Sequence, residues 1–140
     1  MTDIVEAFFY GLYMDPKLIE SLGFEPVSVE KAVVSSYALD LFGSAKIVPR
    51  NNSVVWGNII KLSTSDLKAM YSFESTKHYS PEIVQAKDIQ GNSKFVNCYN
   101  LPESGNEPFN FEYHQKLLTL LKELDFPAEY IVSLQSINEN

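Results

Sequence analysis

The segment from Val27 to Leu62 limits the fold most, because it is rich in β-branched and aromatic residues and contains turns instead of helices. Val27 to Phe42 reads as extended chain, and Ala45 to Val48 reads as a short strand. Asn51-Asn52 predicts a turn, after which Ser53 to Leu62 predicts a further strand. Gly57, inside that strand, indicates a bulge or the close approach of another backbone. Strands joined this closely favour antiparallel pairing.

The rest of the chain adds strands at both ends of this region and helices between and after them. The predicted strands are Ile4–Tyr10 and a hairpin, 81–88 and 94–101, around Gln90-Gly91-Asn92; the predicted helices follow Asp15-Pro16 and Ser63 and cover 109–124 and 127–137. In the second helix, Asp66 lies where a capping box places its acid. The order predicts an α+β fold, a small mixed, largely antiparallel β-barrel with flanking helices, in a single domain over 1–140.

Composition excludes several classes of partner. The net charge is −7 and the basic residues are scattered, so we expect neither nucleic acid nor a membrane as a partner. Cys98 is the single cysteine and cannot close an intrachain disulfide. The N-terminus lacks the basic and apolar regions of a secretory signal, which favours a cytoplasmic location. His78 and His114 show no metal-ligand spacing, and no phosphate-binding loop is present, so no metal and no cofactor are expected.

Two segments remain as candidates for chemistry. The first, AFFYGLYMDP, is a strand that ends in glycine and leads into a helix, which leaves backbone N–H groups free to bind a carboxylate or an oxyanion. An ordinary turn between a strand and a helix has the same sequence pattern. The second is Glu74, three and four residues after Tyr71 and Met70, on or beside the apolar face of the predicted helix. Its carboxylate either reaches solvent at the helix end or is held in a pocket, where desolvation would raise its pKa.

Together these segments resemble the γ-glutamylcyclotransferase family. The motifs FFYGLYM, VVWGNIIKLSTSDLKAMYSFES, HYSPEIV, FVNCYNL and EYHQKLLTLLKEL occur here in the family's order, from Phe8 to about Ile137. The resemblance implies a small α+β barrel with a pocket at one end. It also implies cofactor-free release of 5-oxoproline from a small γ-glutamyl amine or peptide by intramolecular aminolysis.

The resemblance also implies roles for particular residues. Glu74 matches the family's acid/base glutamate. The substrate-binding positions that it implies are Tyr10, Gly11, Leu12, Tyr13, Met14, Tyr79, Tyr99 and Tyr113. Plain core packing is the alternative for Tyr79 and Tyr99.

Several departures from the family pattern keep alternatives open. Leu12 and Tyr13 stand where the family has Ser-Asn or Thr-Leu, so the side-chain hydrogen bonds of Ser or Asn are lost. Ser75 replaces the glycine after the glutamate. The substrate could therefore be a γ-glutamylamine or an isopeptide-derived γ-glutamyl-lysine. The other interpretations are a non-catalytic ligand-binding module and a structural protein without a pocket. The oligomeric state stays open at this point, with a homodimer as one possibility.

Overall fold

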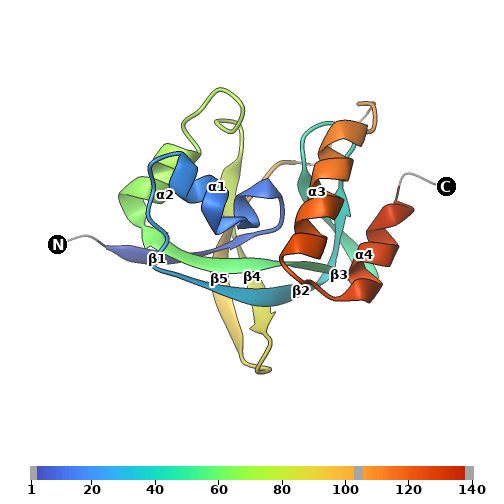
Figure 1. Cartoon of the computed structure of the whole chain (residues 1–140), viewed down its shortest axis with the longest axis horizontal. Helices are drawn as coiled ribbons and strands as arrows, with labels where there is room; N and C mark the ends of the chain where they lie inside the picture. Colours follow the sequence, from blue (N-terminus) through green and yellow to red (C-terminus); the bar gives the residue numbers. More distant parts are fainter. Residues whose placement is uncertain (1–2, 103–105, 138–140) are drawn as a thin grey trace.

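The computed structural model describes residues 3–102 and 106–137 and contains a closed barrel with the strand order β1-β3-β2-β4-β5 (Figure 1). The strands are β1 (Ile4–Phe9), β2 (Ser28–Asp40), β3 (Lys46–Ser63), β4 (Ser80–Asp88) and β5 (Ser93–Asn100). Neighbouring strands run antiparallel except β1 and β5, which pair in parallel at Ala7 and Asn97. The predicted α+β class and the mixed, largely antiparallel barrel are confirmed.

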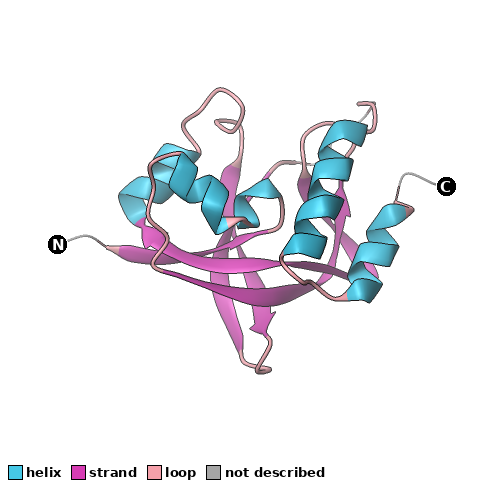
Figure 2. Ribbon diagram, in the orientation of Figure 1, coloured by secondary structure: helices cyan, strands magenta, loops and turns pink. Residues whose placement is uncertain are grey.

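The helices lie in two groups over the barrel (Figure 2). They are the 3₁₀ helix η1 (Leu12–Met14), α1 (Pro16–Ser21), α2 (Thr64–Met70), α3 (Phe111–Glu123) and α4 (Ala128–Gln135). Figure 1 shows α1 and α2 together over one half of the barrel and α3 and α4 over the other. In the described part of the chain, no helix combines the length and the apolar character needed to cross a membrane.

One prediction about the strands is wrong: the turn at Asn51-Asn52 does not divide the region into two strands. β3 continues through it for 18 residues. Its pairing with β2 jumps from Ser35–Val54 to Tyr37–Pro49, so residues 50–53 form a bulge opposite a single residue of β2. The polar residues bend the long strand without ending it, which is the usual effect of a bulge.

The close backbone approach predicted at Gly57 is confirmed. A β-carbon at this position would overlap the carbonyl oxygen of Phe9 on the neighbouring strand β1. Only glycine therefore lets β1 and β3 approach each other at this level of the barrel.

The helix that was expected to carry Glu74 is shorter than predicted. Ser63 caps α2 as expected, since its Oγ accepts from the Asp66 N–H at 3.0 Å; the Asp66 carboxylate, however, accepts from the N–H of Glu25. The helix ends at Met70, where the carbonyl accepts the hydroxyl of Thr76 at 2.8 Å. This side-chain bond turns the chain away from the helix axis. Glu74 therefore lies in the turns that follow α2.

Strand β5 shows the alternation that places its side chains. Val96, Cys98 and Asn100 are buried, whereas Phe95 on the opposite face is 72% exposed. Tyr99 shares that opposite face and is half-buried. Cys98 is a buried thiol in the core.

The last residue of β5 joins two strands that are not neighbours in the barrel. The side-chain oxygen of Asn100 accepts from the Ile47 N–H at 2.9 Å, and its amide nitrogen donates to the Ile47 carbonyl at 2.9 Å. The same nitrogen donates to Glu82 at 3.1 Å, and the oxygen accepts from the Tyr10 hydroxyl at 3.3 Å. Beyond the end of β1, the Asn100 side chain therefore forms hydrogen bonds with the backbone of β3 that a neighbouring strand would otherwise form.

We expect Asn100→Ala to lower the free energy of unfolding by about 2–3 kcal/mol, because two buried backbone groups of Ile47 lose their partners. Urea unfolding measures the loss. The matched control is Asn97→Ala on the same strand, whose amide makes one 3.5 Å contact with Glu6 and should cost under about 1 kcal/mol. Equal losses in the two variants would contradict the role given to Asn100.

Candidate functional site

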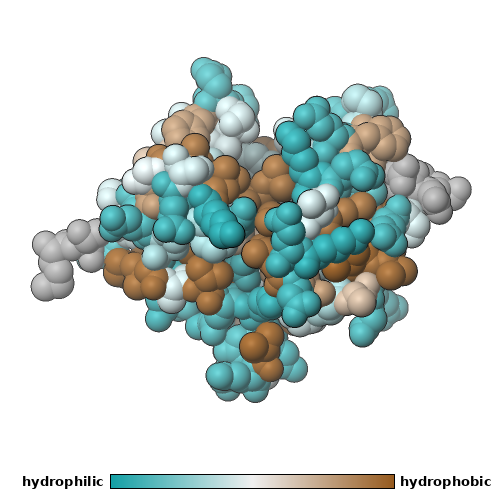
Figure 3. Space-filling model, viewed as in Figure 1, coloured by the Kyte–Doolittle hydropathy of each residue, from teal (hydrophilic) through white to brown (hydrophobic). Residues whose placement is uncertain are grey.

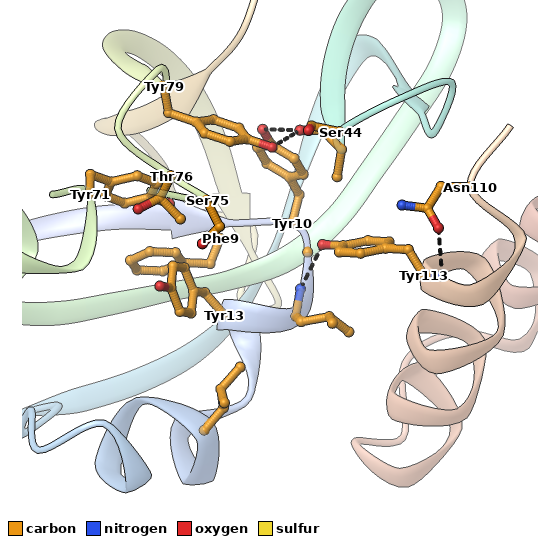
Figure 4. A pocket seen from close by; sticks show the side chains of 14 residues that line it. Phe9, Tyr10, Tyr13, Ser44, Tyr71, Ser75, Thr76, Tyr79, Asn110 and Tyr113 are labelled. Atoms are coloured by element: carbon orange, nitrogen blue, oxygen red, sulfur yellow. Dashed lines mark hydrogen bonds between the residues drawn. The ribbon is translucent and has the colours of Figure 1, made fainter. Parts of the chain in front are cut away.

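A cavity of about 360 Å³ opens at the end of β1 between the two groups of helices (Figure 4). Four separate parts of the chain line it, and in Figure 3 hydrophobic residues gather in the hollow between α1 and α3. The lining residues are Phe9, Tyr10, Gly11, Leu12, Tyr13, Leu18, Ser44, Ala45, Tyr71, Ser75, Thr76, Tyr79, Asn110 and Tyr113. The predicted turn after β1 therefore faces a pocket.

The turn from Gly11 to Tyr13 lines this pocket, and its backbone N–H groups differ in their hydrogen bonding. The Leu12 N–H donates to the Tyr113 hydroxyl at 3.0 Å, and the Met14 N–H closes η1 by donating to the Gly11 carbonyl at 3.0 Å. Below the turn, Asn58 donates to the Met14 carbonyl at 2.7 Å. In the part of the chain that the structure describes, the N–H groups of Gly11 and Tyr13 have no hydrogen-bond partner.

The hydroxyl of Tyr113 fills the space that a side chain at position 11 would occupy. A β-carbon on Gly11 would overlap the hydroxyl oxygen of Tyr113, while the next ring atom, Cζ, would be 3.4 Å away. The Gly11 backbone is extended, with φ −113°, so alanine would meet no backbone strain there. Figure 4 shows the Tyr113 ring reaching from α3 across to the turn.

A buried lysine fixes the opposite wall. Lys46 is 1% exposed, and its ammonium donates to the carbonyls of Phe42 at 2.7 Å and Ser44 at 3.1 Å. The loop that it holds presents the Ala45 carbonyl, which accepts the hydroxyl of Tyr79. The charge of Lys46 is thus satisfied inside the loop and does not reach the pocket.

Stacked tyrosines form the third wall. Tyr71 lies flat against Tyr99, with centroids 4.0 Å apart and planes 6° apart. Tyr13 meets Tyr71 edge to face at 5.9 Å, and Tyr79 lies against Tyr71 at 5.9 Å. Tyr99 therefore supports the pocket from behind Tyr71 instead of lining it.

The tyrosine hydroxyls of the pocket stay protonated at neutral pH. Burial raises the pKa of Tyr113 to about 12, despite the opposing effect of the Leu12 N–H. Burial also raises the pKa of Tyr10, Tyr71 and Tyr79 above the usual value. These groups can donate and accept hydrogen bonds, but they cannot serve as bases near neutral pH.

Glu74 lies beside the pocket but does not line it. Its side chain is 89% exposed and its carboxylate pairs with the Lys77 ammonium at 2.9 Å. The next two residues, Ser75 and Thr76, do line the pocket. The structure thus brings the backbone around Glu74 to the cavity while the carboxylate points to solvent.

The family model described as gamma-glutamyl cyclotransferase, AIG2-like, matches residues 7–122. The chain belongs to this family. A search of curated protein sequences found no match.

Solved structures of similar fold agree with the family. A structure titled gamma-glutamyl cyclotransferase is 21% identical, with a TM-score of 0.80 over 99% of this chain and 90% of its own. An uncharacterized protein from Homo sapiens is 21% identical, with a TM-score of 0.79 over 98% and 89%. An AIG2-like protein from Mus musculus is 17% identical, with a TM-score of 0.61 over 76% and 86%. At these identities the structures establish the fold alone.

Within this family fold, the residues expected at the site fall into three groups. Six of them line the cavity together: Tyr10, Gly11, Leu12 and Tyr13 on one side, with Tyr79 and Tyr113 opposite. Met14 is fully buried beneath the turn and Tyr99 lies behind Tyr71, so both support the lining. Glu74 stays at the rim.

Sequence reasoning missed part of the lining. Ser44 and Ala45 come from a loop whose shape depends on the buried Lys46 and carries no local motif. Asn110 could have been found from the sequence, because asparagine is a preferred N-cap residue just before a helix. Its side chain does cap α3, accepting from the Tyr113 N–H at 3.1 Å. No group of three or more potential metal-ligating side chains occurs in the ranges 3–102 and 106–137.

We expect Gly11→Ala to lower the free energy of unfolding by about 1–3 kcal/mol, because the new methyl group overlaps the Tyr113 hydroxyl. In a Tyr113→Phe background that oxygen is gone, so the same substitution should cost at least about 1 kcal/mol less. Urea unfolding of the two single variants and the double variant measures this coupling. Strictly additive losses would show that the two residues do not meet as described.

Stability should also fall at high pH. The unfolded chain releases tyrosine protons near pH 10, whereas the folded chain retains them until about pH 12 at Tyr113. Above pH 10 the unfolded state binds fewer protons, so the free energy of unfolding decreases, by up to about 1.4 kcal/mol per pH unit for each such tyrosine. Urea unfolding at pH 9, 10 and 11 tests this, and Tyr113→Phe should make the decline less steep. Unchanged stability over this range would argue against buried, neutral hydroxyls.

Proposed function

We propose that this chain is a γ-glutamyl cyclotransferase that releases 5-oxoproline from a small γ-glutamyl amine or peptide bound in the cavity. The observation that carries the proposal is the meeting of two segments at one cavity. The turn Gly11–Tyr13 lies on one side, and Ser75 and Thr76, which adjoin Glu74, lie on another. The family match supports the reaction class.

The reaction needs no co-reactant. The substrate's α-nitrogen attacks its own γ-carbonyl, the ring C–N bond forms and the C–N bond to the leaving amine breaks. Two protons move from the α-ammonium to the leaving nitrogen, which departs as an ammonium, and one hydrogen stays on the lactam nitrogen. The protein's main task is to hold the glutamyl chain curled, which is an effect of orientation.

The turn after β1 would bind the negative groups of the substrate. The N–H groups of Gly11 and Tyr13 would hold its carboxylate or the oxyanion that develops on the γ-carbonyl oxygen. The Leu12 N–H is occupied by Tyr113, whose hydroxyl proton is then free to point at the ligand. Tyr79 donates to the Ala45 carbonyl and would act as a wall.

Glu74 would transfer the protons after its side chain turns inward. Its ion pair with Lys77 is exposed, and exposed pairs contribute only about 0–1 kcal/mol. Opening this pair is therefore an easy step compared with binding. The substrate's α-ammonium would attract the Glu74 carboxylate into the cavity. Glu74 is the one carboxylate in the segment 71–79, which contributes four lining residues.

A non-catalytic ligand-binding module is the second candidate. One observation favours it: all the residues that line the cavity lack a carboxylate, an imidazole, a thiol or an amine. Such a pocket can bind a γ-glutamyl ligand, but it has no acid/base group for catalysis unless the Glu74 side chain enters it. Calorimetry would then detect γ-glutamyl ligands without turnover.

We expect Glu74→Gln to reduce 5-oxoproline release by about 10²-fold to 10⁴-fold, because acid–base catalysis is typically worth that much. The amide keeps the size of the side chain, and the site is exposed, so urea unfolding should match that of the wild type. Product release is measured with a panel of γ-glutamyl compounds.

The matched control is Glu112→Gln, which removes another exposed glutamate that pairs with a lysine one helical turn away. It should leave turnover unchanged. Full activity in Glu74→Gln would remove this residue from the mechanism. Binding without any turnover by the wild type would select the ligand-binding module.

A further inference from the structure

We propose that the amine released from the γ-glutamyl substrate carries an uncharged aromatic ring and no carboxylate group. This inference rests on the proposed function and concerns the part of the substrate beyond the glutamyl unit. It follows from the charge and the ring geometry of the cavity.

The cavity offers no cation to a second carboxylate. Its lining residues include no lysine, arginine or histidine, and its tyrosines are neutral. The substrate's own α-carboxylate can use the N–H groups of Gly11 and Tyr13, which leaves none for another anion. A carboxylate on the leaving amine would lose its water without gaining a partner, which is strongly unfavourable.

Two lysines near the cavity, Lys46 and Lys77, are already engaged. Lys46 is buried and donates to the carbonyls of its own loop. Lys77 pairs with Glu74 outside the pocket. A carboxylate on a leaving group that extends out of the cavity would therefore find neither of these ammonium groups free to pair with it.

The adjoining cavity does not supply a free positive charge either. This second space, of about 440 Å³, shares Leu12 and Leu18 with the first. Its one lining cation, Lys116, pairs with Glu112 at 3.2 Å. Asp15 and Glu123 also line it, so a carboxylate would meet net negative charge there.

Aromatic edges and faces are what the cavity does offer. Phe9 and Tyr13 meet at 6.2 Å and 87°, and Tyr13 meets Tyr71 at 82°. Tyr71 is held by its stack on Tyr99, and Tyr79 is held by its bond to Ala45. Rings fixed in this way lose little entropy when a further ring joins them, and aromatic pairs favour such edge-to-face contacts.

The size of the cavity is compatible with such a ligand. Its 360 Å³ lies at the lower end of the roughly 300–1,000 Å³ usual for small-molecule sites. A site of this size accommodates a glutamyl unit together with one aromatic ring.

Two substrates that differ only by a carboxylate test the inference directly. We expect kcat/KM for γ-glutamylphenethylamine to exceed that for γ-glutamylphenylalanine by at least about tenfold, and the dissociation constants to follow the same order. γ-Glutamylethylamine, which lacks the ring, should fall several-fold below γ-glutamylphenethylamine. Turnover is read as 5-oxoproline release, and binding to Glu74→Gln is read by calorimetry.

A new cation at the pocket should change this preference. Ser75 is exposed and lines the cavity, so Ser75→Arg should raise the relative kcat/KM for γ-glutamylphenylalanine at least several-fold. Gln85→Arg adds the same charge at an exposed position on β4, away from the lining, and should leave the ratio unchanged.

The outcomes separate this inference from the proposed function. Turnover of both matched substrates with equal efficiency, or a preference for γ-glutamylphenylalanine, would overturn the inference and leave the cyclotransferase in place. Selective binding of γ-glutamylphenethylamine without turnover by the wild type would uphold the inference and overturn the enzyme. If neither compound binds or reacts, both fail.

Discussion

The hydrogen bonds of one buried amide, Asn100, connect the barrel to the pocket. β1 ends at Phe9, so the first residues of β3 have no strand beside them on that side. The Asn100 side chain fills the gap by pairing with both backbone groups of Ile47, and its oxygen also accepts from the Tyr10 hydroxyl. The residue that completes the barrel thus also sets the position of the first tyrosine of the site.

The same end of the barrel explains why the pocket forms there. Because β1 stops early, the chain can turn at Gly11 and line a cavity instead of continuing beside a neighbouring strand. The space above the turn is then closed by Tyr113 from α3 and by the loop that Lys46 holds. A buried lysine bonded to carbonyl oxygens stiffens a loop without giving the cavity a charge.

The barrel and the turn after β1 could be read from the sequence, because period-two patterns, glycines and caps act locally. The bulge at residues 50–53 could not, since a polar pair looks the same in a turn and in a bent strand. The length of the helix before Glu74 could not be read for a related reason. An amphipathic pattern extends a helix past Met70, but the hydroxyl of Thr76 ends it by taking the Met70 carbonyl, and no sequence period reveals that bond.

That early helix end decides which groups enter the cavity. With α2 ending at Met70, the ring of Tyr71 turns onto Tyr99, and Ser75 and Thr76 come to the lining while Glu74 faces water. The arrangement keeps an unpaired carboxylate out of an apolar space, where it would be costly without a ligand. In the proposed reaction, a substrate ammonium would reverse this balance, because it would offer the carboxylate a partner inside the cavity. Binding and the inward turn of Glu74 would then be coupled, and a ligand without an ammonium would leave the glutamate paired with Lys77.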